Sequence, residues 1–195
     1  MIGRNNDFNK DLNNLIQEKN YQEIHDIGGS DGFIVKYLNL KKKKYFCYDP
    51  NIYYINLGKR KNKKKKNIFF INKSIDSIHL KNTQKKRIFI FKGVFHHLND
   101  SQIKNFIKKL KRNDAVISID PFYHNNQNIF SILLKKLDKG NFIRNFYEYK
   151  EILIGFSYEK KINYYLRFYS HIIFYKNIKK RHIIQCFNNN KNEKK

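Results

Sequence analysis

Apolar segments with the length of strands alternate with amphipathic helical segments from about residue 21 to about residue 120, and this alternation restricts the fold more than any other feature. Two of the apolar segments, 67–75 and 85–98, are continuous, as in strands that are covered on both faces. We therefore predict an α/β fold: a doubly wound, mostly parallel sheet with helices on both faces. The expected strands span residues 21–27, 44–50, 67–75, 85–98 and 114–123.

The remaining segments complete a single expected domain over residues 1–176, followed by a basic, flexible tail at 177–195. Residues 1–20 are expected to form an N-terminal helix, and helices within 125–155 are candidates to cap a substrate. An aromatic-rich antiparallel hairpin near residues 157–176 is expected to complete the sheet. The other helices are expected at 32–40, 51–66, 99–113, 127–137 and 146–154.

Two of these helices carry specific expectations. Gly58 is expected to end the helix that begins near residue 51. The helix at 32–40 is expected to bury one apolar face, formed by Phe33, Val35, Leu38 and Leu40.

The chain is strongly basic, with a formal net charge of +25 and a pI near 9.9. Nucleic-acid binding is one explanation, and an AT-rich coding bias, which raises Lys, Asn, Ile, Phe and Tyr together, is the other. In the expected topology the basic clusters precede strands, so they belong at the edge of the sheet opposite a ligand site. An RNA substrate needs basic residues at the mouth of the site, so this placement disfavours one. The clusters are residues 41–44, 59–66, 81–87 and 108–113.

Composition also limits the cellular setting. No apolar run reaches the length of a membrane span, and the N-terminus lacks the apolar core of a signal peptide. Cys47 and Cys186 are too few and too isolated for a disulfide framework or a zinc site. A cytoplasmic protein is expected.

A glycine-rich segment, HDIGGSDGF at residues 25–33, follows the first expected strand. In a doubly wound sheet, ligands bind beyond the carboxyl ends of the strands, and glycine lets the main chain approach them closely. Asp49 ends the second strand, where a carboxylate can accept hydrogen bonds from ribose hydroxyls. Each feature alone is also typical of an ordinary turn, but together they predict a site for a ligand that carries a nucleoside.

This loop is similar to the D-x-G-x-G-x-G loop of class I S-adenosylmethionine-dependent methyltransferases of the small-molecule type, with Ser30 in place of the middle glycine. FKGVFHHLND, from residue 91, and VISIDPFY, from residue 116, resemble the family's fourth and fifth strands with their turns. LDKGNFIRNFYEY at 137–149 is similar to a segment of one small-molecule branch. The resemblance covers about residues 21–150 and implies a Rossmann-like fold with S-adenosylmethionine as cofactor.

The resemblance also implies roles for residues. Asp26 would help to hold the cofactor's ammonium group, Asp49 the ribose, and Ser74 or Ile75 the adenine. Arg87 stands where the family often has an aspartate. The implied cofactor-binding residues are Asp26, Gly28, Gly29, Ser30, Gly32, Asp49, Pro50, Ser74, Lys92 and Gly93.

Histidines follow the fourth strand. His97 is the candidate general base for a hydroxyl or acid acceptor; the alternative is that His96 and His97 are both structural. Adjacent residues in extended structure point to opposite sides, so at most one of the two is expected to face the substrate. No metal site is expected, because neighbouring histidines rarely bind one ion and the spacing matches no zinc pattern. The candidate substrate residues are His96, Asp120, Tyr123 and His124.

Three functions stay open at this point. The first is methyl transfer from S-adenosylmethionine to a small-molecule or biosynthetic-intermediate acceptor. The second is RNA methylation, and the third is a non-catalytic binding module with a nucleotide-binding fold, which Ser30 would suit. Four aromatic residues are expected either to cover the acceptor or to pack in the core: Phe142, Phe146, Tyr147 and Tyr149.

Overall fold

The computed structural model describes residues 4–125, 127, 129–138, 140–161 and 171–177. The expected tail beyond residue 177 therefore lies outside the described residues, and so does the turn of the expected hairpin, at 162–170.

The strands form one sheet in the order β3-β2-β1-β4-β5-β8-β7, with the short β6 paired to β5. β1 to β5 are mutually parallel, whereas β8 runs antiparallel between β5 and β7. This arrangement confirms the predicted doubly wound sheet with a C-terminal antiparallel hairpin. Because the order reverses between β1 and β4, a crevice for ligands is expected beyond the carboxyl ends of these two strands. The strands are β1 Glu23–Ile27, β2 Lys44–Asp49, β3 Ile68–Asn72, β4 Arg87–Lys92, β5 Asp114–Tyr123, β6 Arg144–Asn145, β7 Ser157–Lys161 and β8 His171–Asn177.

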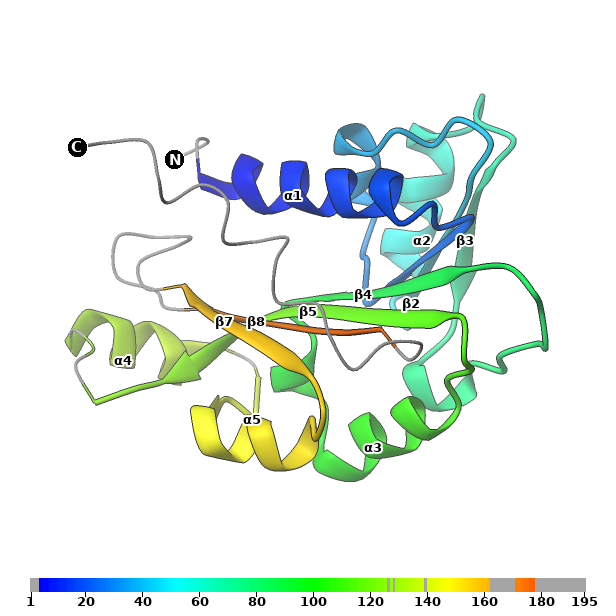
Figure 1. Cartoon of the computed structure of the whole chain (residues 1–195). Helices are drawn as coiled ribbons and strands as arrows, with labels where there is room; N and C mark the ends of the chain where they lie inside the picture. The colour runs from blue at the N-terminus through cyan, green and yellow to red at the C-terminus, as the bar shows by residue number, and fades with distance from the viewer. Residues whose placement is uncertain (1–3, 126, 128, 139, 162–170, 178–195) are drawn as a thin grey trace, which may run out of the picture.

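Helices cover both faces of the sheet (Figure 1). One apolar core lies between the sheet and α1, η1 and α2, and a second lies between the sheet and η2, η3, α3 and α5. β4 is buried along its first five residues, as its continuous apolar run predicted. The same prediction for residues 67–75 is wrong, because β3 lies at the edge of the sheet and buries only Phe70. The helices are α1 Arg4–Glu18, η1 Phe33–Tyr37, α2 Ile52–Lys61, η2 Ile75–Ser77, η3 Phe95–His97, α3 Asp100–Lys108, α4 Ile129–Leu137 and α5 Phe146–Ile152.

α3 begins with a reciprocal cap. The Asn99 side chain accepts a hydrogen bond from the backbone N–H of Gln102, and the Gln102 side chain accepts one from the backbone N–H of Asn99. Such a capping box satisfies two N–H groups that the first helical turn leaves unpaired. Ile103 and Phe106 then point into the second core. The cap therefore fixes where the chain leaves η3 and starts α3.

The two specific expectations about the helices fail in part: Val35 and Leu38 are buried and Leu40 packs against the first core as expected, but the helix type, Phe33 and the role of Gly58 differ. The segment after the glycine loop forms only the 3₁₀ helix η1, because its aromatic and β-branched residues are poor α-helix formers, and Phe33 is 49% exposed rather than buried. Gly58 lies inside α2, which continues to Lys61. A Cβ atom at Gly58 would come within 2.2 Å of the Phe70 ring, so this glycine allows α2 to pack closely on β3.

The four basic clusters defined above lie in the loops that enter β2, β3, β4 and β5 and in the adjoining ends of α2, α3, β2 and β4. Because β1 to β5 are parallel, these loops lie at the edge of the sheet opposite the crevice. The exception is Lys61 of the cluster 59–66, which forms an ion pair with Asp31 of the glycine-rich segment, so the predicted separation of the basic clusters from the ligand side is incomplete. Over the described part of the chain, no helix combines the length and the apolar character that crossing a membrane requires.

Candidate functional site

The glycine loop leaves the end of β1 in a left-handed backbone conformation. Gly28 and Gly32 have φ values of 67° and 74°, and Ser30 between them has a φ of 54°. This conformation suits glycine but costs a residue with a side chain about 1–2 kcal/mol. Ser30 therefore occupies a position whose backbone favours glycine, which gives a physical reason for a glycine in the similar loops.

Gly29 lies directly over Asp26. A Cβ atom at Gly29 would come within 2.4 Å of Asp26 Oδ2 and 2.8 Å of Cys47 Sγ. The buried Asp26 carboxyl accepts a hydrogen bond from the Tyr45 hydroxyl. Burial raises the pKa of Asp26 to about 7, although the Tyr45 hydrogen bond acts in the opposite direction. Asp26 thus forms a buried floor under the loop and titrates near neutral pH.

Asp49 joins the end of β2 to the glycine loop. Its Oδ2 accepts a hydrogen bond of 3.0 Å from the Ser30 backbone N–H, and its Oδ1 accepts one of 2.8 Å from the Asn51 N–H. A carboxylate offers about four acceptor positions, so two remain for the hydroxyls of a ribose. The Asn72 side chain donates to the carbonyl oxygens of Asp49 and Pro50, at 3.0 and 2.8 Å, and so fixes the end of this strand.

The turn after β4 contacts the glycine loop from the other side. A Cβ atom at Gly28 would lie 2.8 Å from the Val94 side chain, so the two turns touch. Lys92 Nζ is 3.5 Å from Asn9 Oδ1 of α1. Burial lowers the pKa of Lys92, while the nearby Asp26 charge acts in the opposite direction. The predicted residues Lys92 and Gly93 therefore lie beside the loop, where α1 packs against them.

The segment after β3 carries the two adenine candidates. Lys73 donates its backbone N–H to the Asp49 carbonyl oxygen at 3.2 Å, which holds this segment next to the end of β2. Ser74 is exposed and Ile75 is buried in the second core. Only Ser74 therefore presents its side chain to the surface.

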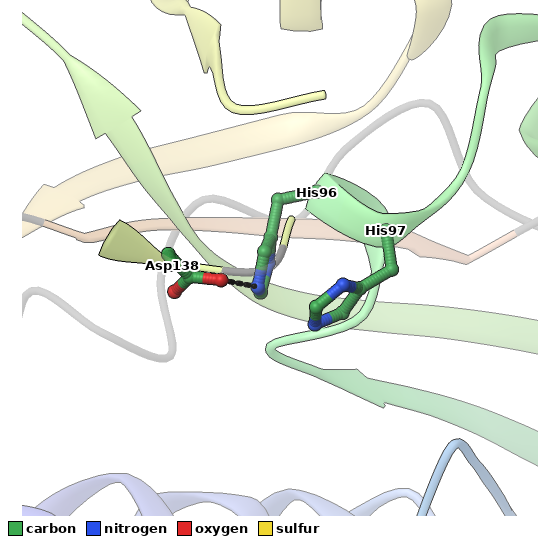
Figure 2. Close-up of side chains that lie close together, drawn as sticks. All are labelled: His96, His97 and Asp138. Carbon is green, nitrogen blue, oxygen red and sulfur yellow. Dashed lines mark ion pairs between the residues drawn. The ribbon is translucent and has the colours of Figure 1, made fainter. Parts of the chain in front are cut away.

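His96 and His97 lie in the 3₁₀ helix η3, and their rings contact with centroids 4.1 Å apart (Figure 2). The expectation that the two side chains point to opposite sides is wrong, because it assumed extended backbone. His96 is 5% exposed; its Nδ1 lies 3.0 Å from Asp120 Oδ1, and its Nε2 lies 3.5 Å from Asp138 Oδ1. His97 is exposed. Two carboxylates therefore flank the buried histidine.

The segment after α4 covers the His96 ring. A Cβ atom at Gly140 would come within 2.1 Å of His96 Cδ2, so only glycine allows this approach. The backbone N–H of Phe142 donates to the His96 carbonyl oxygen at 2.9 Å. Asp120, which is completely buried at the end of β5, also accepts a 3.3 Å hydrogen bond from the His96 backbone N–H. His96 is thus held from β5 on one side and from this segment on the other.

Arg144 connects the same two parts of the chain. Its guanidinium donates to the carbonyl oxygens of Phe95 at 3.0 Å, Leu98 at 2.7 Å and Phe142 at 2.9 Å. It also forms an ion pair with Asp100 at 2.7 Å. This residue is only 6% exposed, so it fixes η3 against the strand β6.

The other predicted substrate residues follow β5. Lys135 Nζ, which donates to the Phe122 carbonyl oxygen, lies 5.3 Å from the centre of the Tyr123 ring. The His124 ring lies tilted against the Phe122 ring, with centroids 5.4 Å apart, and among the described residues it does not belong to the cluster of His96, His97 and Asp138.

The four aromatic residues divide between the two expected roles. Tyr149 is completely buried and donates its hydroxyl to the Pro121 carbonyl oxygen at 3.2 Å, so it is part of the core. Phe142 and Tyr147 are 38% and 74% exposed, which leaves their rings accessible. Phe146 packs against the second core.

Two residues of this site received no role from the sequence: Asp138 and Arg144. Both belong to the LDKGNFIRNFYEY segment, whose resemblance to a methyltransferase segment does not indicate which residues it contacts. Tyr45 was missed as well, because nothing in the sequence indicates that its hydroxyl reaches Asp26.

Comparison with known proteins agrees with this geometry. A family model described as a methyltransferase domain matches residues 24–113. No match was found among curated protein sequences.

Many solved structures share the fold. A SAM-dependent methyltransferase from Leishmania major is 17% identical, with a TM-score of 0.67, over 89% of this chain and 72% of that one. Human N-acetylserotonin methyltransferase, solved with SAM, is 16% identical with a TM-score of 0.63, over 87% of this chain and 51% of that one. The plantazolicin methyltransferase, solved with a substrate analogue and SAH, is 12% identical with a TM-score of 0.62, over 89% of this chain and 84% of that one. The chain thus spans between half and most of the length of these structures.

Proposed function

We propose that this chain, which has the fold of class I S-adenosylmethionine-dependent methyltransferases and matches a methyltransferase family model, methylates a small-molecule or biosynthetic-intermediate acceptor. The observation that carries this proposal is the cradle formed by the glycine loop and Asp49. Side chains are excluded from Gly28 and Gly29 by Val94 and Asp26, and the Asp49 carboxylate retains acceptor positions.

The residues of this cradle fit the cofactor. Gly28, Gly29 and Gly32 would let the main chain approach its methionyl end, with Ser30 completing the loop. Asp49, followed by Pro50, would accept the ribose hydroxyl protons, and Ser74 would lie by the adenine. Lys92 and Gly93 would flank the methionyl portion. When bound, the cofactor supplies an electrophilic methyl group on a sulfonium.

Asp26 has two features that suit the ammonium group of the methionyl end. It lies directly under the glycine loop, and burial raises its pKa to about 7. A bound cation would favour its charged form, so cofactor binding and loss of the Asp26 proton should be coupled.

The protein's own part in the chemistry is to orient the acceptor and to receive its proton. His97, exposed next to the buried His96, is the proposed general base for a hydroxyl or acid acceptor. Asp120, Tyr123 and His124 at the end of β5 are the proposed acceptor contacts, together with the accessible rings of Phe142 and Tyr147. The helices within 125–155 would then cover the acceptor.

Two comparisons and the charge distribution support a small acceptor. The human N-acetylserotonin enzyme and the plantazolicin methyltransferase are named for small-molecule and natural-product substrates. The basic loops of this chain lie at the opposite edge of the sheet from the cradle, which disfavours an RNA substrate. A cytoplasmic setting is part of the proposal, because the buried free thiol of Cys47 suits a reducing compartment.

The test is calorimetric titration of the full chain with S-adenosylmethionine and S-adenosylhomocysteine. We expect saturable binding of both, weakened at least about tenfold in Asp49→Ala because a charge-assisted hydrogen bond is lost. Asp76→Ala, at an exposed aspartate on η2, serves as the control. Absence of binding at about 1 mM cofactor would contradict the proposal. Salt-sensitive RNA binding that competes with turnover would instead favour an RNA substrate.

A further inference from the structure

We propose that His96, His97 and Asp138 bind one divalent transition-metal ion of the zinc type. His96 and His97 come from η3 and Asp138 directly follows α4, and Figure 2 shows Asp138 on one side of the His96 ring and His97 on the other. Each offers one ligand atom, and the three atoms lie within 4.8 Å of one another. The cluster adjoins the turn after β4, since a Cβ atom at Gly93 would lie 3.6 Å from His96 Cε1.

The distance between the ligand atoms of His96 and Asp138 already fits a zinc site. Zinc binds imidazole nitrogen and carboxylate oxygen at about 2.0–2.2 Å, so two such ligands at a tetrahedral angle lie about 3.4 Å apart. His96 Nε2 and Asp138 Oδ1 are 3.5 Å apart. This separation is long for a direct hydrogen bond. The ligand nitrogen of the exposed His97 lies within 4.8 Å of both of these atoms.

The contacts around the ligands fix their orientation as in known metal sites. In the tautomer whose Nδ1–H donates to Asp120, 3.0 Å away, the Nε2 lone pair of His96 points toward Asp138. The backbone N–H of Gly140 donates to Asp138 Oδ1 at 2.8 Å and orients this carboxylate. A carboxylate on the second nitrogen of a ligand histidine is the usual arrangement around zinc.

The same geometry supplies an independent argument for a cation. With Nδ1 donating to Asp120, a neutral His96 presents an acceptor nitrogen to an acceptor oxygen of Asp138. Two facing acceptors need either a proton or a metal ion between them. At 3.5 Å the separation is better matched by an ion than by a bridging proton.

The choice of ion follows from the ligands. Two imidazoles and one carboxylate suit zinc or cobalt, whereas magnesium prefers oxygen ligands. Three protein ligands leave a fourth position open to water or to an acceptor oxygen. The negative charges of Asp138 and Asp120 would compensate the ion in an otherwise basic chain.

The proposal revises the expectation from the sequence that no metal site exists. That expectation rested on the rarity of neighbouring histidines that bind one ion and on the lack of a zinc spacing, whereas the 3₁₀ turn brings the two rings together and Asp138 beside them. While an ion is bound, His97 is a ligand and does not act as a base, so the two proposals for His97 are separable by experiment.

The test is a calorimetric titration of the EDTA-treated and dialysed full chain with ZnCl₂, and in parallel with MgCl₂. We expect one zinc ion per chain and no comparable magnesium binding. His97→Gln and Asp138→Asn should each weaken zinc binding by at least about tenfold. His79→Gln, which removes an exposed histidine of another loop, should bind like the unchanged protein. The unchanged chain loaded with cobalt in place of zinc should show cobalt absorption bands, and these bands should disappear in the same two variants.

Equal zinc affinity in the unchanged chain and in His97→Gln would overturn the proposal, because zinc would then be bound elsewhere, for example by His182 and Cys186. Absence of zinc binding would overturn it as well. His97 is exposed, so its variant should keep its fold and decides the question even if Asp138→Asn unfolds. The titration contains neither cofactor nor acceptor, so its failure leaves the methyl-transfer proposal untouched.

Discussion

The candidate site has two halves, one formed by the glycine loop with Asp49 and one around His96, and they are built differently. The half beneath the glycine loop uses backbone conformation and one carboxylate, from residues 26–32 and Asp49 at the ends of two adjacent strands. The half around His96 uses side chains from distant segments, with Asp120, Asp138 and Arg144 all reaching η3. A loop motif can specify the first half, whereas the second exists only once the chain has folded.

This difference predicts which substitutions each half tolerates and which destabilise it. Backbone geometry resists an added Cβ atom but tolerates most neighbouring side chains. Buried polar contacts resist the loss of either partner, because the remaining group loses its hydrogen bonds away from water.

The largest expected effect is the dependence of the free energy of unfolding on pH that Asp26, beneath the glycine loop, produces. Its pKa is raised from an ordinary 3.8 to about 7 by burial, so the folded state holds the proton more tightly than the unfolded state. This contribution to stability is complete below about pH 4 and is lost as the pH rises to about 7, by up to about 4 kcal/mol. Urea unfolding at several pH values measures it.

Asp26→Asn is the control for that measurement, because the amide does not titrate. The loss of stability between acid and neutral pH should be smaller in this variant than in the unchanged chain. Parallel pH profiles for the two proteins would show that Asp26 titrates normally.

In the histidine half, Arg144→Ala should lower the free energy of unfolding by about 2–4 kcal/mol, because three carbonyl oxygens lose their donor. Chemical unfolding monitored by circular dichroism is the measurement. Arg112→Ala, at an exposed arginine, should change stability by less than about 0.5 kcal/mol. Similar losses in both variants would refute the role given to Arg144 in holding η3.

A pair of glycine variants tests whether the halves are independent. Gly29→Ala and Gly140→Ala should each destabilise the fold by about 1–3 kcal/mol, because each Cβ would overlap a neighbour, Asp26 or His96. Only Gly29→Ala should also prevent cofactor binding, as measured by titration of the folded variants. Equal loss of cofactor binding in Gly140→Ala would show that the two halves act as one site.

The smallest expected effect is a gain in stability. Ser30→Gly should raise the free energy of unfolding by about 0.5–1 kcal/mol, because relief of the left-handed strain exceeds the added flexibility of the unfolded chain. Thermal unfolding detects this shift. Ser101→Gly, in the first turn of α3, should be destabilising and provides the contrast. A destabilised Ser30→Gly would mean that the hydroxyl makes a compensating contact.

The sequence predicted the sheet, because apolar strands and amphipathic helices follow different periodicities. It also predicted the cradle, because glycines and a strand-ending carboxylate are adjacent to the elements that position them. The type of η1 was not predictable from apolar spacing, since a segment of 5 residues is too short to separate the period of about 3.6 residues of an α-helix from the period of about 3.0 of a 3₁₀ helix.

The histidine half could not be assembled from the sequence for a different reason. Its contacts join His96 to Asp138 and Arg144 to Phe95, pairs that are far apart in the chain and follow no periodicity. The adjacent histidines follow a strand, and extended backbone would point their rings to opposite sides. They lie instead in the 3₁₀ helix η3, where the two rings contact each other.

The position of β8 between β5 and β7 has a consequence for the protein during its synthesis. β5 pairs with β8 over seven residue pairs, from Ala115 to Pro121, so one long edge of β5 stays unpaired until the ribosome has released residues 171–177. An unpaired, apolar strand edge is a template for association with other chains. The nascent chain should therefore depend on chaperones until its last strand arrives, and truncation before residue 171 should yield aggregates rather than a smaller domain.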